Sequence, residues 1–160
     1  MKLDDLDQKI IVALETDGRR PFREIARDLG IAEATVRARV NRLITDGLIH
    51  ITAVGDPLKL GVNVMSVILI KVKPGTVKET AEKIARYSNV RFVGTSFGAA
   101  DIIIQTLHPS IEALHRFVTE ELPGAAAQIV STETFQLVDR VKSSWHWQAW
   151  FDQQRELIEQ

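Results

Sequence analysis

Apolar residues recur at helical spacing in three stretches within the first 49 residues. Positions three or four apart lie on the same side of an α-helix, so each stretch presents one apolar stripe for burial. Gly30 separates the second stretch from the third, and Gly47 follows the third as a C-terminal stop. The pattern predicts three helices, the last two joined by a tight turn as in a helix-turn-helix. The three stripes are Leu6, Ile10, Ala13 and Leu14; Phe22, Ile25, Ala26 and Leu29; and Val36, Val40, Leu43 and Ile44.

Local capping signals mark where these helices begin. Asp4 is placed to cap a first helix over residues 6–16, and Asp7 in its first turn complements the helix dipole. Pro21 stands in the first turn of the second helix, where a missing N–H costs nothing. We therefore expect residues 1–49 to form a small three-helix domain of the winged or helix-turn-helix type.

Beyond residue 49 the helical spacing gives way to β-branched apolar runs. Residues 50–54 are typical of a short strand, and turn residues follow them, so we expect a linker at residues 50–62. Four strand patterns then follow, bounded by glycine and proline. They are predicted at residues 64–73, 90–97, 101–107 and 128–141.

Two helical patterns lie between these strands. One opens with a capping box, Thr76 to Glu79, and the other is capped by Ser110 and ends at Pro123-Gly124. The order strand-helix-strand-strand-helix-strand is ferredoxin-like, with an antiparallel sheet and both helices on one face. The whole chain is therefore predicted to be α+β, with a ferredoxin-like domain at residues 63–142.

The first of these strands is apolar on both of its sides. Val67 and Leu69 alternate with Ile68, Ile70 and Val72. Helices on one face can cover only one of these sets. We expect the other face of the sheet to pack on a partner subunit.

Composition and charge narrow the function. The chain is 45% hydrophobic and 26% charged, as soluble globular proteins are, and its formal net charge of −1 offers no global attraction to nucleic acid. Arginine is concentrated locally, on a domain whose net charge is nil. Such local basicity suits specific binding better than bulk adhesion. The arginines between residues 19 and 42 are Arg19, Arg20, Arg23, Arg27, Arg37, Arg39 and Arg42.

Several classes of site find no support in the sequence. The absence of cysteine excludes disulfides, thiolate metal sites and cysteine nucleophiles. His50, His108 and His146 have no partner at metal-ligand spacing, and neither a nucleophile beside a base nor a phosphate-binding glycine loop is present. We predict no metal, cofactor or catalytic site. The N-terminus lacks a signal-peptide core and no run reaches about 20 apolar residues, so we expect a soluble cytoplasmic protein without a membrane partner.

The arginine-rich third helix suggests double-stranded DNA as a partner. A helix fits the major groove of B-DNA, where guanidinium groups reach phosphates or guanine edges. Arg37 and Arg39 are about 200° apart on a helix, so some of the arginines must meet a neighbouring helix or solvent instead. An ordinary helical hairpin with a solvated basic face is the alternative. The candidate DNA-binding residues are Arg20, Arg23, Glu33, Ala34, Thr35, Arg37, Arg39 and Arg42.

The chain resembles the leucine-responsive/asparagine regulator (Lrp/AsnC) family of bacterial and archaeal transcription factors over residues 3 to about 142. The resemblance implies a DNA-binding regulator that forms homodimers through its C-terminal sheets and often assembles into octamers. The matching segments are residues 3–11, Thr35-Val36, Arg37, Arg39, Arg42-Leu43, Gly47-Leu48-Ile49, Asp56-Pro57, Leu60-Gly61, Gly98-Ala99-Ala100-Asp101, Leu122-Pro123-Gly124 and Thr132-Glu133-Thr134.

The resemblance also implies a small-molecule effector, usually an amino acid, bound near the Gly-x-x-Asp turn. In that interpretation Asp101 receives the ammonium group of the effector or orders the loop that does. Interpreted locally, Asp101 is a turn carboxylate that accepts from nearby amides, and the threonines of the last strand are plain β-formers. The candidate effector-binding residues are Phe97, Gly98, Ala99, Ala100, Asp101, Thr132 and Thr134.

Three positions depart from the family pattern. Ala32 replaces a usual serine cap and forgoes about 1 kcal/mol of capping. Phe97 replaces a threonine or serine, and Ala100 replaces an aromatic residue, so the effector pocket differs in size and polarity. Two alternatives stay open: a sirohaem-decarboxylase-like enzyme on the same architecture, and an effector-independent DNA-binding or assembly protein. A Soret band on haem titration would favour the former, and a salt-dependent mobility shift with DNA favours a regulator.

The tail, residues 143–160, is not explained by the resemblance. It carries all three tryptophans, Trp145, Trp147 and Trp150, and is predicted to form an amphipathic helix from about Trp145. A helix of this length is marginal alone in water, so it needs a surface. It could dock on its own sheet, but we hypothesise that it crosses to a neighbouring subunit, because aromatic residues concentrate at interface cores.

Overall fold

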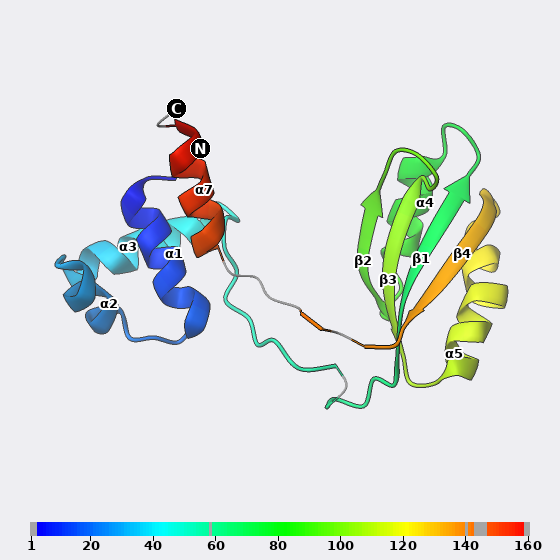
Figure 1. Ribbon diagram of the computed structural model, residues 1–160, viewed down its shortest axis with the longest axis horizontal. Helices are drawn as coiled ribbons and strands as arrows, with labels where there is room; N and C mark the ends of the chain where they lie inside the picture. Colours follow the sequence, from blue (N-terminus) through cyan, green and yellow to red (C-terminus); the bar gives the residue numbers. More distant parts are fainter. Residues whose placement is uncertain (1–2, 58, 140, 143–146, 159–160) are drawn as a thin grey trace. The chain divides into compact units, whose positions relative to one another are not determined.

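The computed structural model describes residues 3–57, 59–139, 141–142 and 147–158, which divide between two compact units (Figure 1). The helical unit joins the residues up to Val54 with those from Lys142 onward. The sheet unit comprises Gly55–Val141. The chain therefore leaves the helical unit and later returns to it.

Four helices pack together in the helical unit: α1 (Asp5–Thr16), α2 (Phe22–Leu29), α3 (Glu33–Thr45) and α7 (Gln148–Ile158). The core takes its side chains from all four, and the first three supply residues of the predicted apolar stripes. The helix-turn-helix predicted from the spacing of apolar residues is thereby confirmed. The buried core residues are Ile10, Ile11, Leu14, Ile25, Ala26, Val36, Val40, Leu43 and Phe151.

The capping predicted for α1 is present and reciprocal. The backbone N–H of Asp7 donates to the Asp4 carboxylate at 2.8 Å, and the N–H of Asp4 donates to the Asp7 carboxylate at 3.2 Å. Gly30 ends α2 with a φ of +67°, a conformation in which a Cβ would be strained. α3 begins after Ala32, which makes no side-chain cap, as alanine requires.

The strand predicted at residues 50–54 is wrong. Among the described residues the strands all belong to one sheet, which lies in the sheet unit. A strand needs a hydrogen-bonding neighbour, and residues 50–54 pair with none of the described strands. Their β-branched residues are exposed instead. The described part of the helical unit thus has no wing, and this segment serves as a connection.

The sheet unit has the predicted ferredoxin-like order of elements. Its four strands are antiparallel and lie in the order β2-β3-β1-β4. The α+β class and the βαββαβ topology are therefore confirmed. The strands are β1 (Val64–Val72), β2 (Val90–Thr95), β3 (Ile102–His108) and β4 (Ile129–Leu137), with α4 (Val77–Ile84) after β1 and a helical stretch opening with α5 (Ile111–Arg116) after β3.

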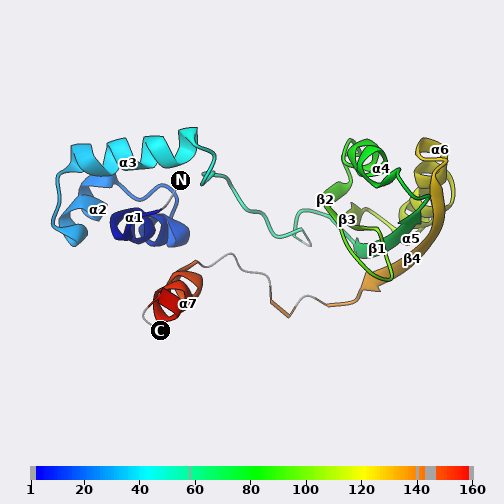
Figure 2. The same cartoon turned by 90° about the horizontal axis from the view of Figure 1, so that it is seen from above.

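Helices cover one face of this sheet. In the register of β1 with β3, Ile68 pairs with Ile104 and Ile70 with Ile102. Directly paired residues point to the same side, and all four are fully buried. Ile84 of α4 lies in the same core, as do side chains from the helical stretch that opens with α5. In Figure 2, α4 and α5 lie on the same side of the four strands.

The opposite face, which we call the open face, keeps apolar side chains that no helix of the sheet unit covers. Several of them are partly or largely exposed, including Phe92 and Phe135. This is the second apolar face predicted from β1. By register the open face includes Met65, Val67, Leu69, Phe92, Ile103, Leu107, Phe135 and Leu137.

In the sheet unit, two helix ends differ between the sequence prediction and the structure. The Thr76 hydroxyl donates to the Lys73 carbonyl at 2.7 Å and makes no cap on α4, so the predicted capping box is wrong. The Ser110 cap is confirmed, since its hydroxyl accepts from the N–H of Ala113 at 3.2 Å. Pro123-Gly124 does not end the helical stretch. A π-helical turn, η1 (Phe117–Glu121), leads into α6 (Leu122–Ala125), where Pro123 stands near the start and requires no N–H partner.

The outer strands are shorter than their apolar patterns. β4 stops at Leu137, which pairs with Met65 near the start of β1. Only Val64 of β1 lies beyond that pair, and the β-branched Val138 and Val141, which lie outside β4, are exposed. β2 likewise ends at Thr95, because the chain turns there to enter β3.

The tail helix packs on α1. Phe151 belongs to the buried core that also contains Ile10 and Leu14. Within this chain the helical unit supplies this surface, and the sheet does not. The crossing to a neighbouring subunit stays a prediction. α7 begins at Gln148 rather than near Trp145, which lies outside the described residues.

Candidate functional site

The outward face of α3 is the surface that a DNA groove would meet. Val36, Val40 and Leu43 turn towards the core, so the residues about 180° away face outwards. The side chains of that outward stripe are small, and two of the four are polar, with arginines only on the flanks. Small side chains allow the helix backbone to approach the floor of a groove. The exposed stripe comprises Ala34, Ala38, Asn41 and Thr45.

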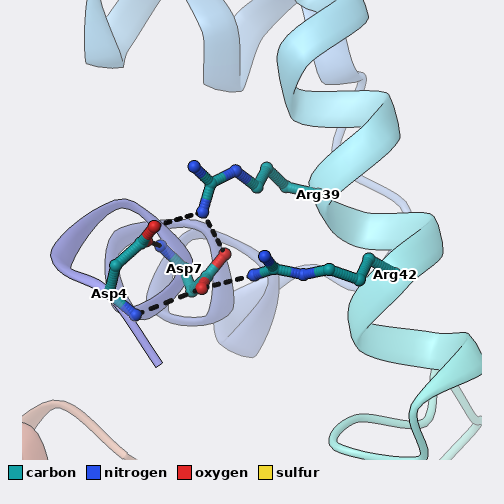
Figure 3. Close-up of polar contacts among 4 residues, drawn as sticks. All are labelled: Asp4, Asp7, Arg39 and Arg42. Carbon is teal, nitrogen blue, oxygen red and sulfur yellow. Dashed lines mark hydrogen bonds and ion pairs between the residues drawn. The ribbon is translucent and has the colours of Figure 1, made fainter. Parts of the chain in front are cut away.

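Arg39 and Arg42 reach from α3 to the N-terminus of α1 (Figure 3). Arg39 Nη1 lies 3.0 Å from Asp7 Oδ1 and also pairs with Asp4, and Arg42 Nη2 pairs with the other oxygen of Asp7. A buried carboxylate is tolerated only with such partners, and Asp7 is 1% exposed. The two arginines therefore fix α3 against α1, and direct DNA contact by them stays a prediction.

Asp4 completes this cluster and remains ionised in it. The hydrogen bond from Arg39, followed by that from the Asp7 backbone, holds the pKa of Asp4 below its ordinary value. The cluster connects residues that lie 32 and 35 positions apart in the sequence. It thus orients the whole recognition helix.

The other candidate DNA-binding residues lie on the surface. Arg37 Nη2 is 2.7 Å from Glu33 Oε1, and the Arg37 guanidinium lies 5.2 Å from the centre of the Phe22 ring. This contact holds Arg37 on the side of α3 that faces α2. Thr35 and Arg23 are exposed, and Arg20 pairs with Asp28 of α2.

The β2–β3 turn, the candidate effector loop, is closed by contacts within the chain. Lys71 Nζ donates to the Gly98 carbonyl at 2.9 Å and to Asp101 Oδ1 at 3.1 Å. Asp101 Oδ2 accepts from the N–H of Val72 at 3.0 Å. The Val72 N–H and then Lys71 hold the pKa of Asp101 below its ordinary value. The geometry thus matches the local interpretation, in which Asp101 orders its own turn.

The remaining effector candidates do not form one cluster. Phe97 is fully exposed and Ala100 is buried, although they are close in sequence. Thr132 pairs with Ile70 and Thr134 with Ile68, so both threonines point to the helix-covered face. Asp101 directly precedes β3 and lies beside Lys71. Since side chains alternate along a strand and Ile70 pairs with Ile102 on the helix-covered side, Lys71 and Asp101 belong to the open face. The turn and the threonines therefore stand at one end of the sheet but on opposite faces.

Sequence analysis did not identify Lys71 as a site residue. A single lysine inside the apolar run of β1 was the available signal. Its partner, Asp101, lies 30 positions away, so only the strand register reveals the pair. Through this contact the ammonium group of Lys71 is the cation that pairs with the Asp101 carboxylate within the same chain.

The described residues offer no metal centre or membrane span. Within them no three His, Cys, Asp or Glu residues come together as a metal-ligating group. No described helix is both long and apolar enough to cross a bilayer.

Comparisons with known proteins agree with this architecture. The AsnC-type helix-turn-helix domain matches residues 3–44, and the Lrp/AsnC ligand binding domain matches residues 65–145. An uncharacterized HTH-type transcriptional regulator of Pyrococcus furiosus is 41% identical over 133 residues, which are 82% of this chain and 89% of that protein.

Two solved structures share the fold. That of E. coli AsnC covers 91% of this chain and 98% of its own, with a TM-score of 0.82 and 24% identity. That of a Neisseria meningitidis transcriptional regulator in complex with L-Met covers 91% and 96%, with a TM-score of 0.81 and 18% identity. The chain therefore belongs to the Lrp/AsnC family, as a DNA-binding transcriptional regulator with a ligand-binding domain.

Proposed function

We propose that the protein binds double-stranded DNA as a homodimer, with the outward stripe of α3 from each copy in the major groove. The observation that carries this proposal is the small, exposed surface of α3 around Ala34, Ala38 and Asn41. Alanine contacts thymine methyl groups, and asparagine bonds the edge of adenine. We place this regulator on chromosomal DNA in the cytoplasm.

Arginines on the flanks would set affinity rather than sequence preference. Arg23 on α2 and Arg37 on α3 are exposed, so they can reach phosphates on either side of the groove. Arg39 and Arg42 contribute to DNA binding by positioning α3, because their ion pairs with Asp4 and Asp7 hold this helix in place. This division replaces the initial expectation that the α3 arginines contact DNA as a group.

The open face of the sheet is the surface that we propose for dimerisation. Its apolar residues are contiguous across β2, β3, β1 and β4 by register. A large exposed apolar surface on a folded unit favours association. The family resemblance extends this proposal to octamers built from such dimers.

We further propose an amino acid or a related metabolite as effector at the β2–β3 turn. The L-Met complex of the Neisseria regulator supports this class of ligand. In this chain the ammonium group of an effector would replace Lys71 Nζ at the Asp101 carboxylate. Phe97, fully exposed beside the turn, would then cover the ligand or contact another subunit.

Footprinting on DNA of the host genome tests the DNA-binding proposal. We expect protected half-sites about one helical turn apart and an affinity that falls with salt. Arg37→Ala and Arg23→Ala should each weaken binding about tenfold. Arg91→Ala, which removes an exposed arginine from β2 in the sheet unit, is the matched control. Equal affinity of all four proteins for the protected DNA would refute this placement.

A further inference from the structure

The tail helix α7 and helix α1 form one packed pair in the helical unit. We propose that α7 is the fourth helix of the DNA-binding domain, so that the ferredoxin-like domain is inserted between α3 and α7. In this arrangement the C-terminus of the chain completes the core of its N-terminal domain. Three features of the helical unit carry the proposal.

The first feature is the burial of Phe151. This side chain is 6% exposed and belongs to the core that contains Ile10, Leu14 and Leu43. An 11-residue helix such as α7 is marginal in water without a packing surface. Phe151 supplies an aromatic anchor for that packing, and α1 supplies the surface. The tail is thus integral to the core rather than an accessory to it.

The second feature is a capping contact between the two helices. Glu15 lies in the last turn of α1, where a carboxylate is unfavourable beside the negative end of the helix dipole. The backbone N–H of Trp147, just before α7, donates to this carboxylate. The start of α7 is the positive end of a helix dipole. A residue placed badly for α1 alone is therefore placed well for the pair.

The third feature is the position of α7 relative to α3. Figure 2 shows α1 between α3 and α7, and the exposed stripe of α3 stays uncovered. Docking of α7 is therefore compatible with a helix in the DNA groove. α7 supports the DNA-binding surface from behind instead of masking it.

This topology gives the DNA-binding domain two covalent connections to the ferredoxin-like domain. The chain leaves the helical unit after Val54 and re-enters it at Lys142. A domain held by one linker turns freely about that linker, whereas two linkers restrict the rotation. The tail thereby limits the orientations in which two DNA-binding domains of a dimer can present α3.

The absence of cysteine allows a direct test by cross-linking. Thr16 of α1 and Gln148 of α7 are exposed and line the same open cavity of about 660 Å³, whose other walls come from α1, α2 and their connection. The full-length protein with Thr16→Cys and Gln148→Cys should form a cross-link within one chain when a short bismaleimide is added. Mass spectrometry and a denaturing gel identify it at the mass of a single chain. Proteins with only one of the two cysteines are the controls.

Two outcomes of that experiment would overturn the proposal. Cross-links found only between chains would mean that α7 docks on the α1 of another copy. No cross-link at all, with both thiols reactive towards a monofunctional maleimide, would mean that α7 does not dock on α1.

A second measurement tests whether α7 belongs to the folded core. Phe151→Ala should lower the midpoint of thermal unfolding, followed by tryptophan fluorescence, by about 10 °C. Trp150→Ala removes a neighbouring side chain that is 51% exposed and should lower the midpoint far less. Equal midpoints for Phe151→Ala and the parent protein would reject the role of α7 in the core.

Discussion

Asp7 lies buried at the start of α1, with its Oδ1 atom 3.0 Å from Nη1 of Arg39 on α3. The same carboxylate pairs with Arg42 and accepts from the backbone of Asp4. One acidic side chain thus completes the capping box of the first helix and holds the recognition helix against it. DNA affinity and stability of the helical unit should therefore depend on a residue that faces away from the DNA.

Replacing Asp7 with alanine should destabilise the helical unit by about 2–4 kcal/mol. The substitution leaves Arg42 without its carboxylate and Arg39 with Asp4 alone, and it removes half of the capping box. Denaturant unfolding followed by tryptophan fluorescence measures the change. Asp5→Ala, an exposed acidic residue in the same turn, is the control and should cost under about 1 kcal/mol. Similar losses for both variants would contradict the special role of Asp7.

His108 should make the sheet unit less stable in mild acid. Burial lowers the pKa of His108, while Glu121 raises it by a smaller amount. Because the folded-state pKa lies below the unfolded value of 6.5, the unfolded chain takes up the proton first as pH falls. The free energy of unfolding therefore keeps its full value above about pH 6.5. At lower pH it decreases, by at most about 1.4 kcal/mol per pH unit. Unfolding curves between pH 8 and 5 measure this slope.

The controls for His108 are two histidine variants. His108→Gln should flatten the acid slope, although it also disturbs the 2.9 Å contact with Thr106 Oγ1. His115→Gln changes an exposed histidine on α5 and should leave the slope as it is. A slope that persists in His108→Gln would assign the acid sensitivity to another group.

Phe135→Lys should weaken the dimer. Phe135 is 46% exposed on the open face, and a lysine there would place a charge in an apolar interface. Ile111→Lys is the matched control, because Ile111 is 55% exposed but lies on α5. Light scattering over a concentration series should show dissociation at a higher concentration for Phe135→Lys only. Unchanged mass for Phe135→Lys would remove the open face as the dimer surface.

Local patterns in the sequence predicted the elements well where neighbours in the chain determine them. Asp4 and Asp7 are three residues apart, so their capping was readable directly. The apolar stripes of α1 to α3 became the core except for Ile44, which is exposed. Residues 50–54 show the limit of such reasoning. Their β-branched residues favour a strand, but strand formation also needs a partner, which the local sequence does not specify.

Contacts between distant residues decided the functional details. The sequence showed that the arginines of α3 cannot share one face, but not which partner each of them meets. Arg39 and Arg42 meet Asp4 and Asp7, while Arg37 meets Phe22. The amphipathic tail required a surface, but its own pattern fits any apolar surface. Only the packed helices identify α1 as the partner of Phe151.

Lys71→Met should change the response of the protein to amino acids. The substitution frees the Asp101 carboxylate and the Gly98 carbonyl of their shared donor, so an external ammonium group meets less competition. We expect a larger thermal shift with amino acids and a loss of stability below about 1 kcal/mol, since the ion pair is partly exposed. Lys83→Met, which breaks an exposed pair on α4, is the control. Identical ligand responses in both variants would show that effectors do not use Asp101.

Undocking the tail should relax the spacing of DNA half-sites. The parent protein should lose affinity when about 5 base pairs are inserted between half-sites and regain it with about 10, because the second insertion restores the helical phase. Phe151→Ala frees α7 from the core that contains Leu14, leaving one connection to orient the DNA-binding domain. It should therefore tolerate the 5-base-pair insertion better, measured by fluorescence anisotropy well below the unfolding midpoint. Trp150→Ala should keep the phase dependence of the parent. If Phe151→Ala kept it as well, the second connection would contribute nothing to half-site geometry, and the linker at residues 50–62 would have to set the spacing alone.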